Sequence, residues 1–481
     1  MMGRILTILL LGLSLAGCAA KGALKLDCAD FAAFVHPIEL TPLERQIRAL
    51  DLETLPPAER DLANRLAAAE IARLRGDPAF LAARPSPERP LLLLSGGGQW
   101  GAFGVGLMNQ LVENRQFPDF AVVTGVSTGA LQALFVGAGL DRQDGEGAAI
   151  RQALADAYSP ARESDIIDRE RWQAMAAING ALANLKPLRR RFEQRICPAI
   201  YDPASPAGRA GLCIVRTLRD AKGRKVLLGL IEANSGEFGY VDVQELLAPY
   251  GDGAADLARA TQCLAGAALA SAAVPAFYQQ VRVDGKTYYD GGVRQSVFLA
   301  SVADAQRLAS ELVRRERARL LDRQPEAASQ AAGDIYVIRN GPTWLPPDQA
   351  VLPGHPADID THADALRAVQ RSEAIMVNQL EIGSIAALRL GRPGGGVWFV
   401  SADGYRNYTP TYDRGIKCGP LKEAARGAMF VPGFMRCMMD YGRNRATGGE
   451  PWIDLCHYDG TETRAVCRRP DGTMPGAVGR F

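Results

Sequence analysis

Residues 120–129 read Phe-Ala-Val-Val-Thr-Gly-Val-Ser-Thr-Gly, an apolar run typical of a strand that ends in a tight, glycine-flanked turn. A second apolar run, 130–138, follows and is typical of a helix. A serine on a sharp strand-to-helix turn has its hydroxyl pushed away from the backbone, and flanking glycines let the helix pass close by. Gly125, Ser127 and Gly129 therefore predict a nucleophilic serine. Because the chain has 50 glycines, this pattern needs support from its surroundings.

A glycine-rich loop lies one strand-helix unit upstream. Pro90 precedes the apolar run Leu91–Leu94, which is short enough for a buried parallel strand. Ser95-Gly96-Gly97-Gly98-Gln99-Trp100-Gly101 follows, and then a stretch typical of a helix, 102–113. Consecutive glycines expose backbone N–H groups, and the helix start adds a positive dipole end. The loop is suited to holding a phosphate, or the oxyanion that forms when a serine attacks an ester.

The same glycines also fit a nucleotide-binding pattern. Gly96, Gly98 and Gly101 are spaced as in the dinucleotide fingerprint, which needs an acidic residue at the end of the second strand. The nearest acid, Asp119, comes before that strand, and the loop lacks the lysine of a phosphate-binding P-loop. These absences favour an oxyanion hole.

A nucleophilic serine needs a base. The chain has four histidines, at positions 36, 355, 362 and 457. A Ser–Asp–His order along the chain would have to use one of the last three, His355, His362 or His457. Asp290 is the better candidate, because it ends a short strand and precedes Gly291 and Gly292. Paired glycines let the backbone turn sharply and leave the carboxylate directed into a site. Taken alone, Asp-Gly-Gly is an ordinary turn.

Together the three motifs, in this order, resemble those of patatin-like phospholipases. The resemblance covers residues 90–300 and continues more loosely through 335–340 and the helix after Asp360. It implies an α/β fold, a three-layer sandwich whose mostly parallel central sheet is flanked by helices. It also implies a lipid acyl-ester hydrolase, of the phospholipase A or lysophospholipase type, that needs neither cofactor nor metal.

The resemblance assigns roles to particular residues. Ser127 is the nucleophile and Asp290 the base of a dyad that uses no histidine. Gly96, Gly97 and Gly98 form the oxyanion hole. The remaining motif glycines are Gly101, Gly125, Gly129, Gly291 and Gly292.

The chain departs from the family pattern at two places. A basic residue often follows the glycine triplet, where this chain has Gln99 and Trp100. An Asn-Pro turn often follows Asp-Gly-Gly, where this chain has Val293-Arg294-Gln295-Ser296. The first departure motivates an alternative, a catalytically inactive protein of the same fold that binds lipid or a partner in the cell envelope.

The N-terminus predicts export. Arg4 precedes an apolar stretch, 5–13, that is too short to span a bilayer, and Leu15-Ala16-Gly17-Cys18 follows. This arrangement resembles a bacterial lipoprotein signal peptide, 1–17, with Cys18 as the lipidated residue. Ala19 after the cysteine favours sorting to the outer membrane. We therefore expect a domain anchored by lipid to a membrane surface of the bacterial envelope.

Cysteine content agrees with export. Apart from Cys18, eight of the nine cysteines remain, an even set that suggests disulfides in an exported chain. Three pairs are plausible because their cysteines are close in sequence: Cys197–Cys213, Cys418–Cys437 and Cys456–Cys467. Cys28 and Cys263 are then left without a nearby partner in sequence. The formal charge of +2 gives no reason to expect a nucleic-acid partner. The oligomeric state stays open.

The rest of the chain divides into recognisable segments. Residues 18–89 are expected to begin with a tether at 19–40. A capping box at 41–44 then predicts the start of one helix, and a second helix is expected over 57–75. The catalytic domain is expected at 90–402, and a cysteine-bearing extension with a helix near 434–445 at 403–481. Further strands are predicted at 212–218, 225–233, 279–283, 335–339 and 397–401.

Overall fold

The computed structural model describes residues 23–38, 57–82, 89–169, 181–220, 224–298, 300–324, 334–345, 365–390, 396–413, 415–424, 428–448 and 451–455. Several sequence predictions lie outside these residues: the signal peptide, Cys18, the capping box at 41–44, three histidines (His355, His362 and His457) and the pair Cys456–Cys467.

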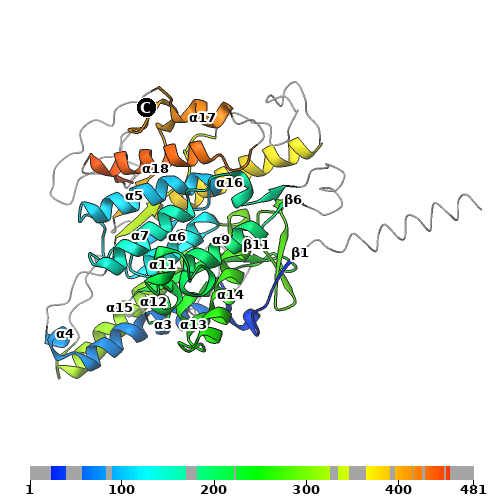
Figure 1. Ribbon diagram of the computed structural model, residues 1–481. Helices are drawn as coiled ribbons and strands as arrows, with labels where there is room; N and C mark the ends of the chain where they lie inside the picture. The colour runs from blue at the N-terminus through cyan, green and yellow to red at the C-terminus, as the bar shows by residue number, and fades with distance from the viewer. Residues whose placement is uncertain are drawn as a thin grey trace, which may run out of the picture.

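A large mixed sheet forms the centre of the molecule (Figure 1). Five neighbouring strands are parallel, in the order β7 (Lys225–Glu232), β4 (Val122–Val126), β3 (Leu91–Leu94), β12 (Ile335–Ile338) and β13 (Val397–Val400). Antiparallel partners extend it: β11 (Lys286–Asp290) and β8 (Phe238–Asp242) pair with β7, and β14 (Ile453–Asp454) pairs with β13. The outer strands are β10 (Gln280–Val283), β1 (Ala23–Leu26) and β2 (Val35–Pro37). A separate small sheet holds β5 (Asp168–Arg169), β6 (Ala181–Asn184) and β9 (Ala276–Tyr278).

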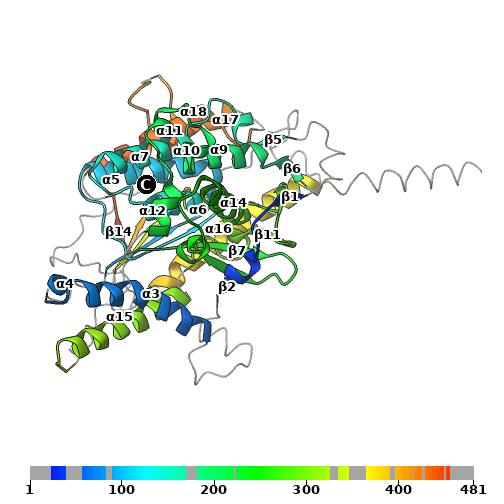
Figure 2. The same cartoon turned by 60° about the horizontal axis from the view of Figure 1, so that its bottom comes forward.

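Helices cover both faces of the sheet, so the central strands are apolar on both sides. Leu92 and Leu94 pack into a core with the helices of one face, and Leu91 and Leu93 pack into a second core on the other. Figure 2 shows the helices on the two sides of the sheet. The first face carries α5 (Gly101–Glu113), α6 (Thr128–Gly137), α7 (Gly145–Ala157), α9 (Lys186–Ile196), α12 (Ile214–Asp220), α13 (Val243–Leu247), α14 (Ala254–Ser271) and α18 (Pro432–Thr447). The second carries α3 (Pro57–Gly76), α15 (Ala300–Leu320) and α16 (Ala365–Leu390). The short helices are α4 (Pro78–Ala82), α10 (Pro198–Tyr201), α11 (Pro206–Arg209) and α17 (Cys418–Ala424). The predicted α/β sandwich is confirmed.

Two sequence predictions differ from the structure. The apolar run at 212–218, predicted as a strand, lies largely in helix α12. Its buried side chains, Ile214, Val215 and Leu218, follow helical spacing, and short apolar runs are ambiguous between strand and helix. Residues 23–38, expected as a tether, instead contribute β1 and β2 to the sheet.

Three disulfides join the described parts of the chain. The local pairs Cys197–Cys213 and Cys418–Cys437 are confirmed. The two cysteines left over from the local pairing, Cys28 and Cys263, bond to each other across 235 residues of sequence. This bond links the segment after β1 to helix α14.

Loss of the Cys28–Cys263 bond should lower stability strongly, because it closes a very long loop in the unfolded chain. We expect Cys28→Ser/Cys263→Ser to lower the free energy of unfolding by about 2–5 kcal/mol in chemical denaturation. The matched control is Cys197→Ser/Cys213→Ser, whose loop of 16 residues predicts a smaller loss. Equal losses would contradict the loop-length argument.

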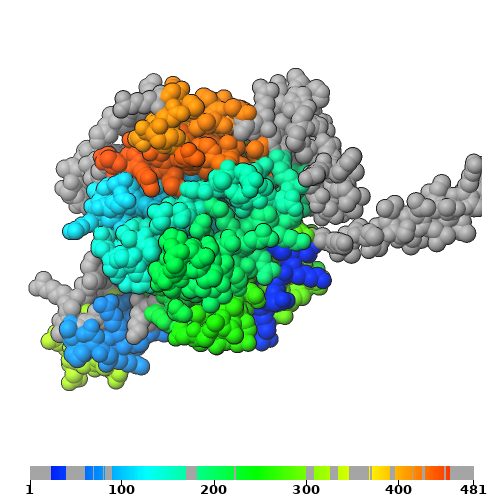
Figure 3. Space-filling model, viewed as in Figure 1, coloured from blue at the N-terminus to red at the C-terminus, as the bar shows by residue number. Residues whose placement is uncertain are grey.

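The C-terminal extension packs directly on the glycine-loop helix, as the orange and red segment over the cyan one shows (Figure 3). Glycines let the backbones of α5 and α18 touch. A Cβ on Gly106 would lie 1.9 Å from the carbonyl oxygen of Met439, and one on Gly442 would lie 2.1 Å from that of Phe103. The extension is therefore an integral layer over α5.

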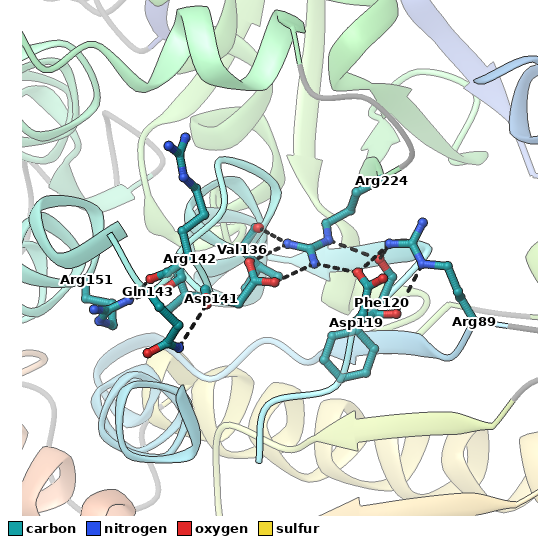
Figure 4. Close-up of polar contacts among 10 residues, drawn as sticks. Arg89, Asp119, Phe120, Val136, Asp141, Arg142, Gln143, Arg151 and Arg224 are labelled. Atoms are coloured by element: carbon teal, nitrogen blue, oxygen red, sulfur yellow. Dashed lines mark hydrogen bonds and ion pairs between the residues drawn. The ribbon is translucent and has the colours of Figure 1, made fainter. Parts of the chain in front are cut away.

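An ionic cluster holds the end of the sheet where β3, β4 and β7 begin (Figure 4). Arg224 binds both carboxylate oxygens of Asp141, at 2.8 and 2.9 Å, and donates to the carbonyl oxygens of Phe120 and Val136. Asp119 joins Arg224 to Arg89, at 3.2 and 2.6 Å. Burial alone would raise the pKa of Asp141, but the hydrogen bond and charge of Arg224 lower it overall. The glycine loop and Ser127 lie at the opposite ends of these strands.

Candidate active site

Ser127 lies in a strained backbone conformation between β4 and α6. Its φ is 55° and its ψ is −124°, a region that side-chain-bearing residues rarely occupy and that is typical of nucleophile turns. The Ser127 N–H donates to the Ser271 hydroxyl at 2.9 Å, which donates onward to the Gly229 carbonyl at 2.6 Å. Ser271 thus ties the turn to the end of α14 and to β7, which compensates for the strain.

The glycines on either side of Ser127 are sterically required. A Cβ on Gly125 would lie 2.3 Å from the Gly129 carbonyl oxygen, and a Cβ on Gly129 would lie 2.2 Å from that of Leu94. The turn therefore brings α6 against β3, as the sequence pattern predicts.

Tyr158 holds the first residue of α6. Its hydroxyl donates to the Thr128 carbonyl at 2.8 Å and lies 2.6 Å from the Thr128 hydroxyl. A Cβ on Gly101 would lie 2.2 Å from that Thr128 hydroxyl, so the last glycine of the upstream loop makes room for it.

The glycine loop lines the same cavity as Ser127. Gly97 has a φ of 141°, and a Cβ there would lie 1.8 Å from the Asn340 carbonyl oxygen. The Gly96 N–H donates to the Ser296 hydroxyl at 3.1 Å. Within the described residues, the N–H groups of Gly97 and Gly98 have no acceptor. Of the three N–H groups in the predicted oxyanion triplet, that of Gly96 therefore already has an acceptor.

A buried amide network fixes this loop in place. Asn340 donates through its side chain to the Ser95 carbonyl at 2.8 Å and to Gln132 at 2.9 Å. Gln132 in turn donates to the Gly101 carbonyl at 2.7 Å. Both ends of the loop are therefore held by side chains that follow β12 or lie on α6.

Asp290 ends β11 and is only 2% exposed. Its Oδ1 accepts a hydrogen bond from the Gly292 N–H at 2.7 Å, so the Asp-Gly-Gly turn orients the carboxyl group. Burial raises the pKa of Asp290 to about 7, against the opposing effects of the nearby Ser127 side chain and the Gly292 N–H. Its Oδ2 makes no hydrogen bond of good geometry within the described residues. A carboxyl group with this pKa is suited to exchanging protons near neutral pH.

Ser127 and Asp290 line the same cavity, of about 400 Å³. The glycine loop forms one side, and the rest of the wall is mostly apolar but includes five charged residues on or next to β12, α16 and α17: Arg339, Arg371, Glu373, Glu381 and Lys422. Arg339 and Glu381 form an ion pair at 3.1 Å. Burial, and to a lesser extent the negative charge of Asp290, raises the pKa of Glu373 to about 7.

A second, mostly apolar cavity of about 70 Å³ meets the first at Ser127. The two share Gly98, Ser127, Tyr278 and Phe430. The smaller one runs among apolar side chains of α6, α7 and α9 and their neighbours, including Leu131, Phe135, Leu185, Leu188, Phe192 and Ile196.

Histidine does not line either cavity within the described residues. His36, on β2, instead bonds to Glu245 at 2.7 Å. Of the residues that support the site, sequence reasoning did not single out Ser271, Ser296, Asn340 or Gln132. One signal existed for Asn340: it follows a strand whose carboxyl end meets those of β3 and β4.

The family of the central domain can be assigned from its sequence. Residues 92–303 match the family model of the patatin-like phospholipases. No curated protein matches the chain in sequence. Among solved structures, the crystal structure of VipD from Legionella pneumophila is similar, with 12% identity, a TM-score of 0.30, and coverage of 74% of this chain and 68% of that one. The family match spans the glycine loop, Ser127 and Asp290, and residues 92–303 therefore form a patatin-like phospholipase domain.

Proposed function

We propose that this protein hydrolyses acyl esters of lipids, as a phospholipase A or lysophospholipase, through an acyl-enzyme on Ser127. The observation that carries the proposal is a buried carboxyl group, Asp290, with its pKa raised to about 7 beside a strained serine at a glycine loop. The match to the patatin-like phospholipase family supports a lipid ester as the substrate.

Each step uses a group already described. The Ser127 oxygen attacks the ester carbonyl carbon as its proton passes to Asp290. The N–H groups of Gly97 and Gly98 bind the oxyanion that develops. Collapse breaks the ester bond, and the departing alcohol takes the proton from Asp290. Water then gives a proton to Asp290 and attacks the carbonyl carbon of the acyl-enzyme. The bond to the Ser127 oxygen breaks, that oxygen takes the proton back from Asp290, and the fatty acid is released.

The apolar cavity is suited to the acyl chain. It begins at Ser127 and is lined almost wholly by apolar side chains, so a chain held there has its carbonyl carbon next to the nucleophile. The larger cavity, whose wall includes charged side chains, then receives the rest of the lipid.

Filling the apolar cavity should shorten the accepted acyl chain. We expect Leu188→Trp to lower kcat/KM for long-chain nitrophenyl esters by about tenfold or more, since about 1.4 kcal/mol of lost burial is tenfold in rate. Acetyl and butyryl esters should keep kcat/KM within about twofold, because such chains bury little surface. Leu188→Ala is the matched control, and it should not lower kcat/KM for long-chain esters relative to short-chain ones. A uniform loss over all chain lengths would place the acyl group elsewhere.

We also propose that Cys18 is lipidated and anchors the protein to the outer membrane. The sequence at 1–18 and the disulfides support export. Cys18 lies five residues before Ala23, the first residue of β1, a span of at most about 18 Å. An anchored domain would therefore lie close to the bilayer. Within the described residues, no helix is both long and apolar enough to cross a membrane.

Exposed apolar side chains next to the larger cavity support contact with lipid. Trp344 is 81% exposed beside the cavity residue Leu345, and Met376 is 57% exposed between the cavity residues Ala374 and Val377. Such side chains are suited to inserting into a membrane interface.

The direct test is hydrolysis of phospholipid vesicles by the purified protein, with released fatty acids and lysophospholipids read by mass spectrometry. Fatty acid release supports the hydrolase, and its positional origin identifies the type. Lipid binding without release would instead support the inactive alternative. Anchoring is tested by metabolic labelling with radioactive palmitate, which should label the wild type and not Cys18→Ala.

A further inference from the structure

Lys422 brings a positive charge from the C-terminal extension to the glycine loop. It lies on α17, is partly buried and lines the larger cavity together with Gly96, Gly98 and Trp100. Its ammonium nitrogen lies 5.4 Å from the centre of the Trp100 ring and 6.0 Å from that of Phe434. Aromatic faces attract a cation at such distances and so hold it at the cavity wall.

The helix that carries Lys422 is held firmly. The Cys418–Cys437 disulfide joins its first residue to α18, which packs on α5. The next residue, Glu423, pairs with Arg406 at 2.6 Å. Trp100 itself packs edge-on against Tyr405 and Phe434, and Gln99 accepts a hydrogen bond from the Val431 N–H at 3.0 Å. The two residues that depart from the family pattern therefore dock the extension.

This packing places a positive charge beside a loop, residues 95–101, that carries no charged side chain of its own. The ring of Trp100 holds the ammonium group of Lys422 at that position. Burial lowers the pKa of Lys422 to about 8, so the group is mostly protonated at neutral pH and gains from an anion beside it.

Other charged groups line the same cavity. Arg339 already pairs with Glu381 and donates to Asn378 at 2.6 Å and to the Pro342 carbonyl. Its charge is therefore offset by a carboxylate held in the same wall. The pKa of Glu373, raised to about 7, lessens the negative charge that would repel an anion.

We propose that Lys422 binds the phosphate group of the lipid substrate, so that the C-terminal extension completes the head-group site of the patatin-like domain. The inference rests on the proposed lipid hydrolase activity and names its substrate class as phosphate-bearing lipids. A phosphate oxygen accepts a charge-assisted hydrogen bond from the ammonium group while the ester carbonyl lies at Ser127.

The test compares a phosphate-bearing ester with a neutral one. We expect Lys422→Met to raise KM for phosphatidylglycerol in mixed micelles by about tenfold or more, because a charged hydrogen bond to the substrate is lost. The KM for butyryl nitrophenyl ester, which has no phosphate, should not rise in this way, and kcat should change less than KM. Lys422→Arg should recover most of the difference. Lys417→Met removes an exposed lysine just before α17 and should match the wild type. An equal loss on both esters, or no change on either, would overturn the proposal.

Two further measurements distinguish a lipid head-group site from a site for free phosphate. Binding of a non-hydrolysable ether phospholipid to Ser127→Ala and to Ser127→Ala/Lys422→Met needs no turnover, so weaker binding in the double variant supports the site even if no hydrolysis is found. Inorganic phosphate is added as a competitor of nitrophenyl ester hydrolysis. Inhibition that depends on Lys422, with phosphatidylglycerol KM unchanged in Lys422→Met, would mean that the site takes free phosphate and not lipid.

Discussion

Ser127→Ala is expected to abolish acyl-ester hydrolysis, lowering kcat by about 10³-fold or more. In the proposed mechanism the Ser127 hydroxyl oxygen becomes acylated, and the oxyanion donors cannot replace it. Labelling with a fluorophosphonate probe should likewise occur in the wild type and be lost in this variant. Steady-state hydrolysis and the label together measure the effect, and a labelled Ser127→Ala protein would assign the nucleophile elsewhere.

Asp290→Asn should cause a comparable loss. The double variant with Ser127→Ala should be little worse than either single one, since the proposed mechanism uses the two residues as a unit. His36→Ala is the control for the histidine alternative, because His36 bonds to Glu245 and lines neither cavity. Replacement of His355, His362 and His457 completes that control. A loss on replacing any histidine, with Asp290→Asn active, would favour a Ser–His–Asp triad.

The second large effect is on stability. Asp290→Asn should remove activity and yet raise the free energy of unfolding at alkaline pH by as much as about 4 kcal/mol. The pKa of Asp290 rises from 3.8 to about 7 on folding, which is about three units at ~1.4 kcal/mol each. The folded state holds the proton more tightly than the unfolded one, so wild-type stability falls as pH rises from about 4 to about 7. The asparagine has no such charge to bury and can still accept the Gly292 hydrogen bond.

Denaturant unfolding of both proteins at pH 4 and pH 9 measures this difference. The advantage of the variant should be small at the lower pH, where the Asp290 carboxyl is protonated in the folded state, and largest at the higher. The wild-type kcat/KM should rise with pH through about 7 over the same range, because the base must be ionised to accept the serine proton. A stability difference that does not depend on pH would contradict the buried carboxyl assignment.

Much of the fold followed from local sequence. The all-apolar strand Leu91–Leu94 and the apolar run before Ser127 predicted buried parallel strands, because a strand covered on both faces has no polar side. Gly125 and Gly129 predicted a tight turn, because only glycine permits the backbone approach found there. The run at 212–218 was mistaken for a strand, because its helical spacing becomes evident only over several turns.

The features of the candidate site also fall into two groups, those that local motifs predicted and those that only the tertiary structure decided. The order of the glycine loop, the serine turn and Asp-Gly-Gly predicted Ser127 and Asp290 as site residues, since each motif depends on a turn formed by adjacent residues. Burial of Asp290, the support of Ser127 by Ser271, the apolar cavity and the contact of Lys422 with Trp100 were decided only by the tertiary structure. These features arise from packing between residues far apart in sequence, and the local pattern that sets a turn carries no information about which distant side chain will lie against it.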